Sequence, residues 1–275
     1  MAIVIFFLVQ WQLSVFFQSF FLHRYGAHRQ FSMSLRMERV FHFLAWFVMG
    51  SSFLSPRGYA ILHRMHHAYS DTPKDPHSPV QQPNLFKMMN GTHDIYRSIL
   101  RRKQEPEARF EGGYPTWPAM DRIMSSWPSS FGFGAIYAAI YLLYVQSTGS
   151  YWVLALLPFH WYLGPIHGAI VNYFGHKLGY RNFDSDDASK NTLVFDVLTA
   201  GELFQNNHHK FGQSPNFGVR WFELDPTYQV MKVLNAVGLI DMSKSQVARW
   251  TPGKREAEPE PISEPSLSTP TTSAI

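Results

Sequence analysis

The chain has 275 residues, with 24 Lys and Arg, 20 Asp and Glu, 13 His and no Cys, and its formal net charge is +4. The lack of cysteine excludes disulfides, thiolate catalysis, iron–sulfur clusters and cysteine-based zinc sites, so nitrogen and oxygen must hold any metal. All the cationic residues lie in 23–122 and 173–275, whereas 1–22 and 123–172 are apolar. This pattern is typical of a membrane protein with its cationic parts on one side, and it argues against a nucleic-acid-binding protein.

The apolar stretches predict helices in the following order. Residues 2–22 are about one bilayer long and are predicted to span the membrane. The apolar part of 37–54 is too short for a comfortable span and predicts a helix at the membrane interface. Residues 131–147 and 151–172 are joined by the short polar link STGS, which predicts a helical hairpin. Residues 251–275 are rich in Pro, Glu, Ser and Thr and predict a disordered tail.

Histidines gather in four groups next to these apolar segments. Imidazoles three or four positions apart share one face of a helix, whereas a pair five apart needs a helix end or a bend to converge. Eight imidazoles exceed what one ion binds and suit two transition-metal ions, and spacing alone leaves zinc, copper, iron and nickel open. The groups are His23 and His28; His63, His66 and His67; His176, with Asn172 one turn earlier; and His208 and His209, with Gln205 one turn earlier.

Topology brings the same groups to one side of the membrane. If 37–54 stays at one face of the membrane, the first span ends with His23 on that side. The hairpin 131–172 crosses the membrane twice, so His176 at its end lies on the same side. The distribution of cationic residues requires the same arrangement. The isolated histidines are expected to be structural; they are His42, His77, His93, His160 and His167. His160 and His167 lie within the last predicted span, where an ionisable residue points to a function.

The stretches FFLHRYGAHRQF, LHRMHHAYSDTPKDPHSP, VNYFGHKLGYRNF and GELFQNNHH resemble the histidine boxes of membrane-bound fatty acid desaturases. The likeness is to the acyl-CoA (stearoyl-CoA delta-nine) branch and runs from about Gln18 to Ile240. It implies an all-α fold for residues 1–250, with about three membrane spans, an interfacial helix and a cytosolic helical cap that holds a histidine-rich dimetal site. The implied ligands of two Fe²⁺ ions are the eight grouped histidines, with Asn172 acting through water and Gln205 as an uncertain further ligand.

The resemblance also implies the reaction and its partners. An O2-dependent enzyme would insert a cis double bond, at delta-nine, into a saturated acyl chain on CoA or another carrier. It would take electrons from a ferredoxin or from a cytochrome b-type protein with its reductase. No catalytic residue is expected beyond the metal centre, because no side chain breaks an unactivated C–H bond. The substrate-binding residues are left open, although a tunnel between residues 2–22 and 151–172 is expected. Buried imidazoles need acceptors for their second ring nitrogen, and the candidates are Asp71, Asp75, Asp186 and Glu202.

Three departures from the family pattern stand out. Gln205 occupies the place of a histidine, so an amide oxygen, Glu202 or a water would complete that position. Ile61 and Leu62 occupy places where animal members have the Arg-Asp pair that holds CoA, which opens the choice to an acyl carrier protein or a lipid-bound chain. The family usually has a span before the helix that ends in the first box, so a reduced topology or a truncated start is expected.

Two other functions fit the same residues. A membrane di-iron hydroxylase of lipids, carotenoids or alkanes would use the same irons with a small shift of the substrate. A non-enzymatic membrane metal-binding protein would store or transport metal. A transporter would place its ligands near the middle of the membrane, whereas these groups lie at the ends of the predicted spans.

Overall fold

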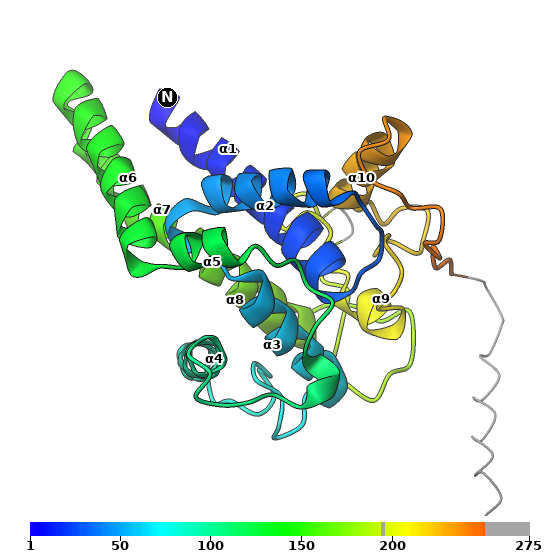
Figure 1. Ribbon diagram of the computed structural model, residues 1–275. Coiled ribbons are helices and arrows are strands. Elements are labelled where there is room, and N and C mark those ends of the chain that lie inside the picture. Colours follow the sequence, from blue (N-terminus) through cyan, green and yellow to red (C-terminus); the bar gives the residue numbers. More distant parts are fainter. Residues whose placement is uncertain (194–195, 251–275) are drawn as a thin grey trace, which may run out of the picture.

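The computed structural model describes residues 1–193 and 196–250, and the predicted tail 251–275 lies outside this part. Within the described residues the chain is helical, and extended segments meet only as isolated β-bridges. The all-α prediction is therefore confirmed. Figure 1 shows α1 and α6 projecting together from a body that contains α3, α8 and α9.

The first span is longer than the apolar run predicts. Helix α1 (Ala2–Phe17) continues without a break into the π-helix η1 (Gln18–Ala27), which makes one element of 26 residues. Helix α6 (Trp127–Thr148) is the second element long and apolar enough to cross a membrane. Ser126 begins α6 by accepting a hydrogen bond from the Ser129 backbone amide. Gly149 ends it in the left-handed region at φ 69°.

The predicted span 151–172 is bent rather than straight. The 3₁₀-helix η4 (Tyr151–Leu156) and α7 (Leu157–Trp161) meet α8 (Leu163–Lys177) at 68°. The two parts together could form a third span, so the described residues hold two or three membrane-crossing elements. Pro158 and Pro165 each lack the amide hydrogen that a continuous helix needs, which favours a break between them.

The helix predicted near 37–54 forms as α2 (Leu35–Met49), which crosses α1 in Figure 1, and its place at a membrane interface stays a prediction. It ends at Gly50, where φ is +55° and a Cβ atom would lie 1.9 Å from the Tyr137 hydroxyl oxygen, so a side chain is excluded there. The short 3₁₀-helix η2 (Gly50–Ser52) then turns the chain into α3 (Pro56–Tyr69).

The remaining elements cover the polar side of the molecule. Helix α4 (Leu85–Leu100) packs against α3 and α8. The 3₁₀-helix η3 (Ala108–Phe110) also contacts α3, and α5 (Pro118–Met124) leads into α6. Helix α9 (Gln205–Lys210) packs against α8, and α10 (Pro226–Ala236) packs against η1.

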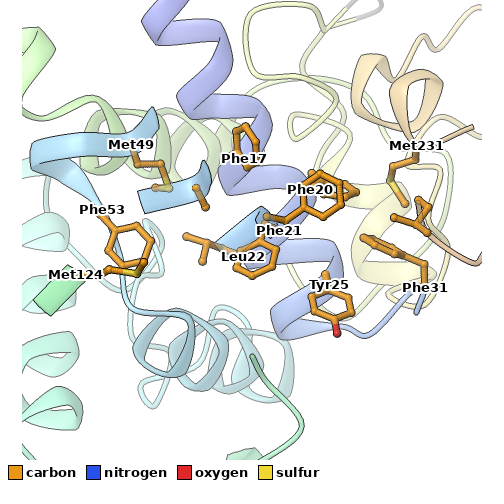
Figure 2. Close-up of a cluster of buried hydrophobic side chains, with 13 residues drawn as sticks. Phe17, Phe20, Phe21, Leu22, Tyr25, Phe31, Met49, Phe53, Met124 and Met231 are labelled. Carbon is orange, nitrogen blue, oxygen red and sulfur yellow. The ribbon is translucent and has the colours of Figure 1, made fainter. Parts of the chain in front are cut away.

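The main apolar core surrounds the junction between α1 and η1. Figure 2 shows Phe21 and Leu22 in its centre, with Met49 and Met124 on one side and Met231 on the other. The same segment carries a fully buried cation, Arg24. Its guanidinium donates to both carboxylate oxygens of Asp225, at 2.9 and 3.2 Å. The core therefore fixes the end of the first span, the segment that carries the first histidine group.

Candidate metal centre

The π-helix η1 brings the two histidines of the first pair onto one helical face. The His28 amide donates to the His23 carbonyl at 3.1 Å, which is the i→i+5 bond of a π-turn. This wider turn places residues five apart on one face, and the two rings lie 5.1 Å apart. The sequence required a bend or a helix end here, and the structure supplies a π-helix that ends at His28.

The other groups lie on three further helices. Helix α3 presents His63, His66 and His67, and Arg64 between them donates to the carbonyls of Gly26 and Ala27. These bonds tie α3 to the end of η1. His176 lies in the last turn of α8. His208 and His209 lie in the last turn of the short helix α9.

The eight grouped histidines converge into two adjacent clusters. Within each cluster one ligand nitrogen from every residue lies within 4.8 Å of all the others. The first cluster, called the pentad below, consists of His23, His28, His63, His67 and His208. The second, called the triad, consists of His66, His176 and His209.

The distances fit nitrogen ligands around a metal ion. Ligands bound at right angles with bonds of about 2.1 Å lie about 3 Å apart, and ligands on opposite sides lie about 4.2 Å apart. In the pentad, Nε2 of His208 lies 3.0 Å from that of His23 and 2.9 Å from that of His67. In the triad, Nε2 of His66 lies 3.2 Å from that of His209. Nε2 of His176 is buried and has no partner in the described residues. The donor set thus suits two ions.

Carboxylates hold the second nitrogen of every triad imidazole. Nδ1 of His66 lies 2.9 Å from both oxygens of Asp75, and Nδ1 of His176 lies 2.9 Å from Asp71. Nδ1 of His209 donates to Asp187. Each pair places the proton on Nδ1 and leaves Nε2 free for a metal. Asp71 and Asp75 are confirmed as acceptors, whereas the prediction of Asp186 is wrong because its neighbour Asp187 takes that place.

Glu202 performs the same role in the pentad. Its Oε2 accepts from Nδ1 of His23 at 2.5 Å, and its Oε1 accepts from the Ser19 hydroxyl at 2.5 Å. Burial raises the pKa of this carboxyl, but the interaction with His23, the charge of Arg24 and the hydrogen bond from Ser19 outweigh burial and hold the pKa at about 2. Glu202 is therefore anionic and already bonded, so it does not replace the missing histidine of the fourth group.

Four of the five pentad imidazoles are kept neutral. Burial lowers the pKa of His28, His63, His67 and His208 well below the usual range, and the neighbouring imidazoles lower it further. Burial raises the pKa of Asp187, but the hydrogen bonds from His209, Ser189 and Ser185 outweigh it, so the net shift is downward. Neutral imidazole beside ionised carboxylate is the protonation state that a metal ion requires.

A largely apolar cavity of about 190 Å³ lies beside the clusters. His23 and His63 contribute to its wall, and α8 lines it along one face with Gly164, Gly168 and Val171. Leu62 also lines it. The predicted tunnel between the first span and α8 thus has a counterpart, to which α3 and α4 contribute further side chains, including Tyr59, Met89 and Tyr96.

The two amide residues have definite places. Asn172 lines the cavity one turn before His176. Gln205 also lines it, and its Nε2 donates to the Glu202 carbonyl at 2.6 Å. Gly175 makes room for Gln205, because a Cβ atom there would lie 2.5 Å from Gln205 Cγ.

The isolated histidines divide into two sets. His42 and His160 lie away from the clusters, near Asp121 and Tyr141 respectively. His77, His93 and His167 line the cavity. His77 is buried with its ring 4.2 Å from that of His66, so the expectation of a merely structural role missed its place beside the triad. Its position two residues after Asp75 was the available signal.

A family model for fatty acid desaturases matches residues 1–238 of the chain. The chain belongs to the fatty acid desaturase family. The desaturase is thus an oxidoreductase of fatty acid metabolism, and its apolar helices identify a membrane protein.

Relatives of this desaturase act on different acyl carriers. It is 28% identical over 90% of its length to the hex-5-enoyl-[acyl-carrier protein] acetylenase of Moorena producens, of which it covers 78%. It is 28% identical over 82% of its length to the acyl-CoA C20 Delta5-desaturase of Anemone leveillei, of which it covers 68%. It is 26% identical over 80% of its length to the delta-9 desaturase-like 2 protein of Arabidopsis thaliana, of which it covers 70%. These matches support acyl desaturation in general.

Proposed function

We propose that the protein is an O2-dependent desaturase that inserts a cis double bond at delta-nine of a saturated acyl chain carried by CoA or another acyl carrier. The pentad and the triad would each hold one Fe²⁺. The observation that supports this proposal most strongly is that eight imidazoles from four distant segments meet in two clusters. The nitrogen–nitrogen distances in these clusters fit metal coordination. Family membership supports iron rather than zinc, copper or nickel.

When bound, the two irons would supply the activation of O2 that removes two hydrogens from adjacent methylenes. The protein's own residues position the reactants. Asp71, Asp75, Asp187 and Glu202 hold the Nδ1 protons, so every Nε2 that they control faces the centre. The apolar cavity along α8 would orient the acyl chain past His23 and His63 and exclude water from it.

The carrier is the part of the substrate that the site specifies least. Ile61 is fully buried and Leu62 lines the cavity, so neither can bind a CoA headgroup by charge. An acyl carrier protein, named in the Moorena relative, is therefore as suitable as CoA, named in the Anemone relative. The delta-nine position is supported by the Arabidopsis relative, whereas the Anemone relative is named a Delta5-desaturase.

We place the active site on the cytosolic face. Arg and Lys occur on the segments that carry the histidines and are missing from 1–22 and 123–172, which agrees with the positive-inside rule. An acidic ferredoxin or a cytochrome b-type protein with its reductase would deliver electrons to this cationic side.

Expression of the chain in an aerobic host, followed by fatty acid profiling with double-bond mapping, tests the proposal. The expected product is a new monounsaturated acid with its double bond at delta-nine. New hydroxyl groups would indicate a hydroxylase instead. Bound metal with unchanged lipids, although O2, acyl-CoA, acyl carrier protein substrates and matched reductants are supplied, would favour a metal-binding role without catalysis.

A further inference from the structure

The pentad has more imidazoles than the triad, but fewer of them have a carboxylate partner. The pentad has five imidazoles and the triad has three. Every triad imidazole nevertheless has an aspartate on Nδ1, namely Asp75, Asp71 or Asp187. Within residues 1–193 and 196–250, His23 is the pentad member with a carboxylate within 4.0 Å, that of Glu202. The triad is therefore poorer in neutral ligands and richer in negative charge.

The groups around these carboxylates increase the difference in negative charge between the two clusters. Nη2 of the buried Arg24 lies 3.7 Å from Glu202, so a cation compensates part of the negative charge beside the pentad. The other hydrogen bonds to the triad carboxylates come from neutral groups. Asp71 accepts from the Ser78 hydroxyl and the Ala188 amide, and Asp187 accepts from the hydroxyls of Ser185 and Ser189.

Asp75, the most buried of the three triad aspartates, also accepts its other hydrogen bonds from neutral groups. Its side chain is fully buried, and the backbone amides of Asp71 and His77 donate to it at 2.8 and 3.0 Å. Asp71 has φ 59°, a left-handed conformation that Asp tolerates better than most residues. The loop after α3 is thus built to bring two carboxylates under the triad. In a buried site, nearby negative charge stabilises the more highly charged form of a cation.

Resting on the proposed function, we infer that Asp71, Asp75 and Asp187 make the triad position the one that favours Fe³⁺, while the pentad favours Fe²⁺. Oxidation is then sequential. The first electron leaves the ion held by the triad, which becomes Fe³⁺, and passes to a one-electron oxidant; the ion in the pentad follows at a higher potential. In the proposed reaction O2 is the acceptor of these electrons.

A redox titration of the detergent-purified full chain carrying two ⁵⁷Fe²⁺ ions tests this inference. Ferricyanide is added in steps, and Mössbauer and electron paramagnetic resonance spectra are recorded at each step. The expected half-oxidised sample contains a valence-localised Fe²⁺/Fe³⁺ pair. With ¹⁵N-labelled histidine, pulsed resonance should count three imidazole nitrogens on Fe³⁺, and a count of five would overturn the inference.

Two matched carboxylate-to-amide variants assign the steps. Asp187→Asn should shift the first oxidation to a more positive potential and bring the two steps closer together. Glu202→Gln should shift the second oxidation and leave the first in place. Iron is counted in both variants, and if Asp187→Asn has lost an ion, the nitrogen count on the wild-type protein decides the matter alone.

The failure of the inference is distinguishable from the failure of the proposed function. Oxidation of both irons in one step, or a shift of the first step by Glu202→Gln but not by Asp187→Asn, in a preparation that forms double bonds, overturns the inference alone. A preparation that binds no iron overturns both.

Discussion

Replacement of His66 by alanine should remove one iron and abolish desaturation. The imidazole is one of three in the triad; its Nε2 lies 3.2 Å from that of His209, and its Nδ1 is held by Asp75. Loss of an outer partner of a metal ligand typically lowers affinity 10–100-fold, so loss of the ligand itself should cost at least about 100-fold, or about 2.8 kcal/mol. The pentad keeps all five imidazoles.

The assay is iron content per chain together with the fatty acid profile of the host. His66→Ala should hold about half the iron of the wild type and form no new monounsaturated acid. His42→Ala is the matched control, because His42 is equally buried but lies outside both clusters, beside Asp121. Full iron and activity in His66→Ala, or the same losses in His42→Ala, would refute the reasoning.

Three further predictions follow from other parts of the structure. Gly168→Leu should restrict the enzyme to shorter acyl chains, because Gly168 lines the cavity and a Cβ atom there meets nothing within 4 Å. A series of substrates of different chain length measures this effect. Gly132→Leu is the control and should leave the chain-length preference unchanged, because a Cβ atom at Gly132 also meets nothing within 4 Å but Gly132 lies outside the cavity. Arg24→Met should lower the midpoint of thermal unfolding, since it leaves the buried Asp225 without its cation at a cost of about 3–5 kcal/mol; an unchanged midpoint would contradict this. The metal-free protein should unfold at a lower temperature at pH 5.5 than at pH 8, because the lowered pKa values of the pentad imidazoles mean that the unfolded chain gains protons below about pH 6.5 while the folded chain does not. An equal or higher midpoint at pH 5.5 would exclude this linkage.

The sequence predicted much of the site because its determinants are local. Helical spacing places His63, His66 and His67 on one face, and the apolar lengths place the spans that carry them. The convergence of the four groups followed from topology, because only one arrangement of the interfacial helix let the spans end together. The structure brings the four groups together, with Nε2 of His23 and of His208 3.0 Å apart, and the side of the membrane stays a prediction.

The remaining features depend on contacts that local patterns do not encode. Asp186 and Asp187 are equivalent in sequence, and only the tertiary path of the loop makes Asp187 the partner of His209. The π-helix that aligns the first pair is a backbone irregularity without a composition signal. The bend before α8 lies inside an apolar run that length alone reads as one span. His77 is brought beside His66 by a turn after α3, so its place could not be read from helical spacing.

The central claim is that nitrogen ligands from four segments hold two ions side by side. A cryo-electron microscopy map of the iron-loaded chain in detergent tests it most directly. The account predicts two metal densities, one within the pentad and one within the triad, each in contact with the Nε2 atoms of its cluster. A single density, or a density between Asp75 and His77 with the triad left empty, would contradict it.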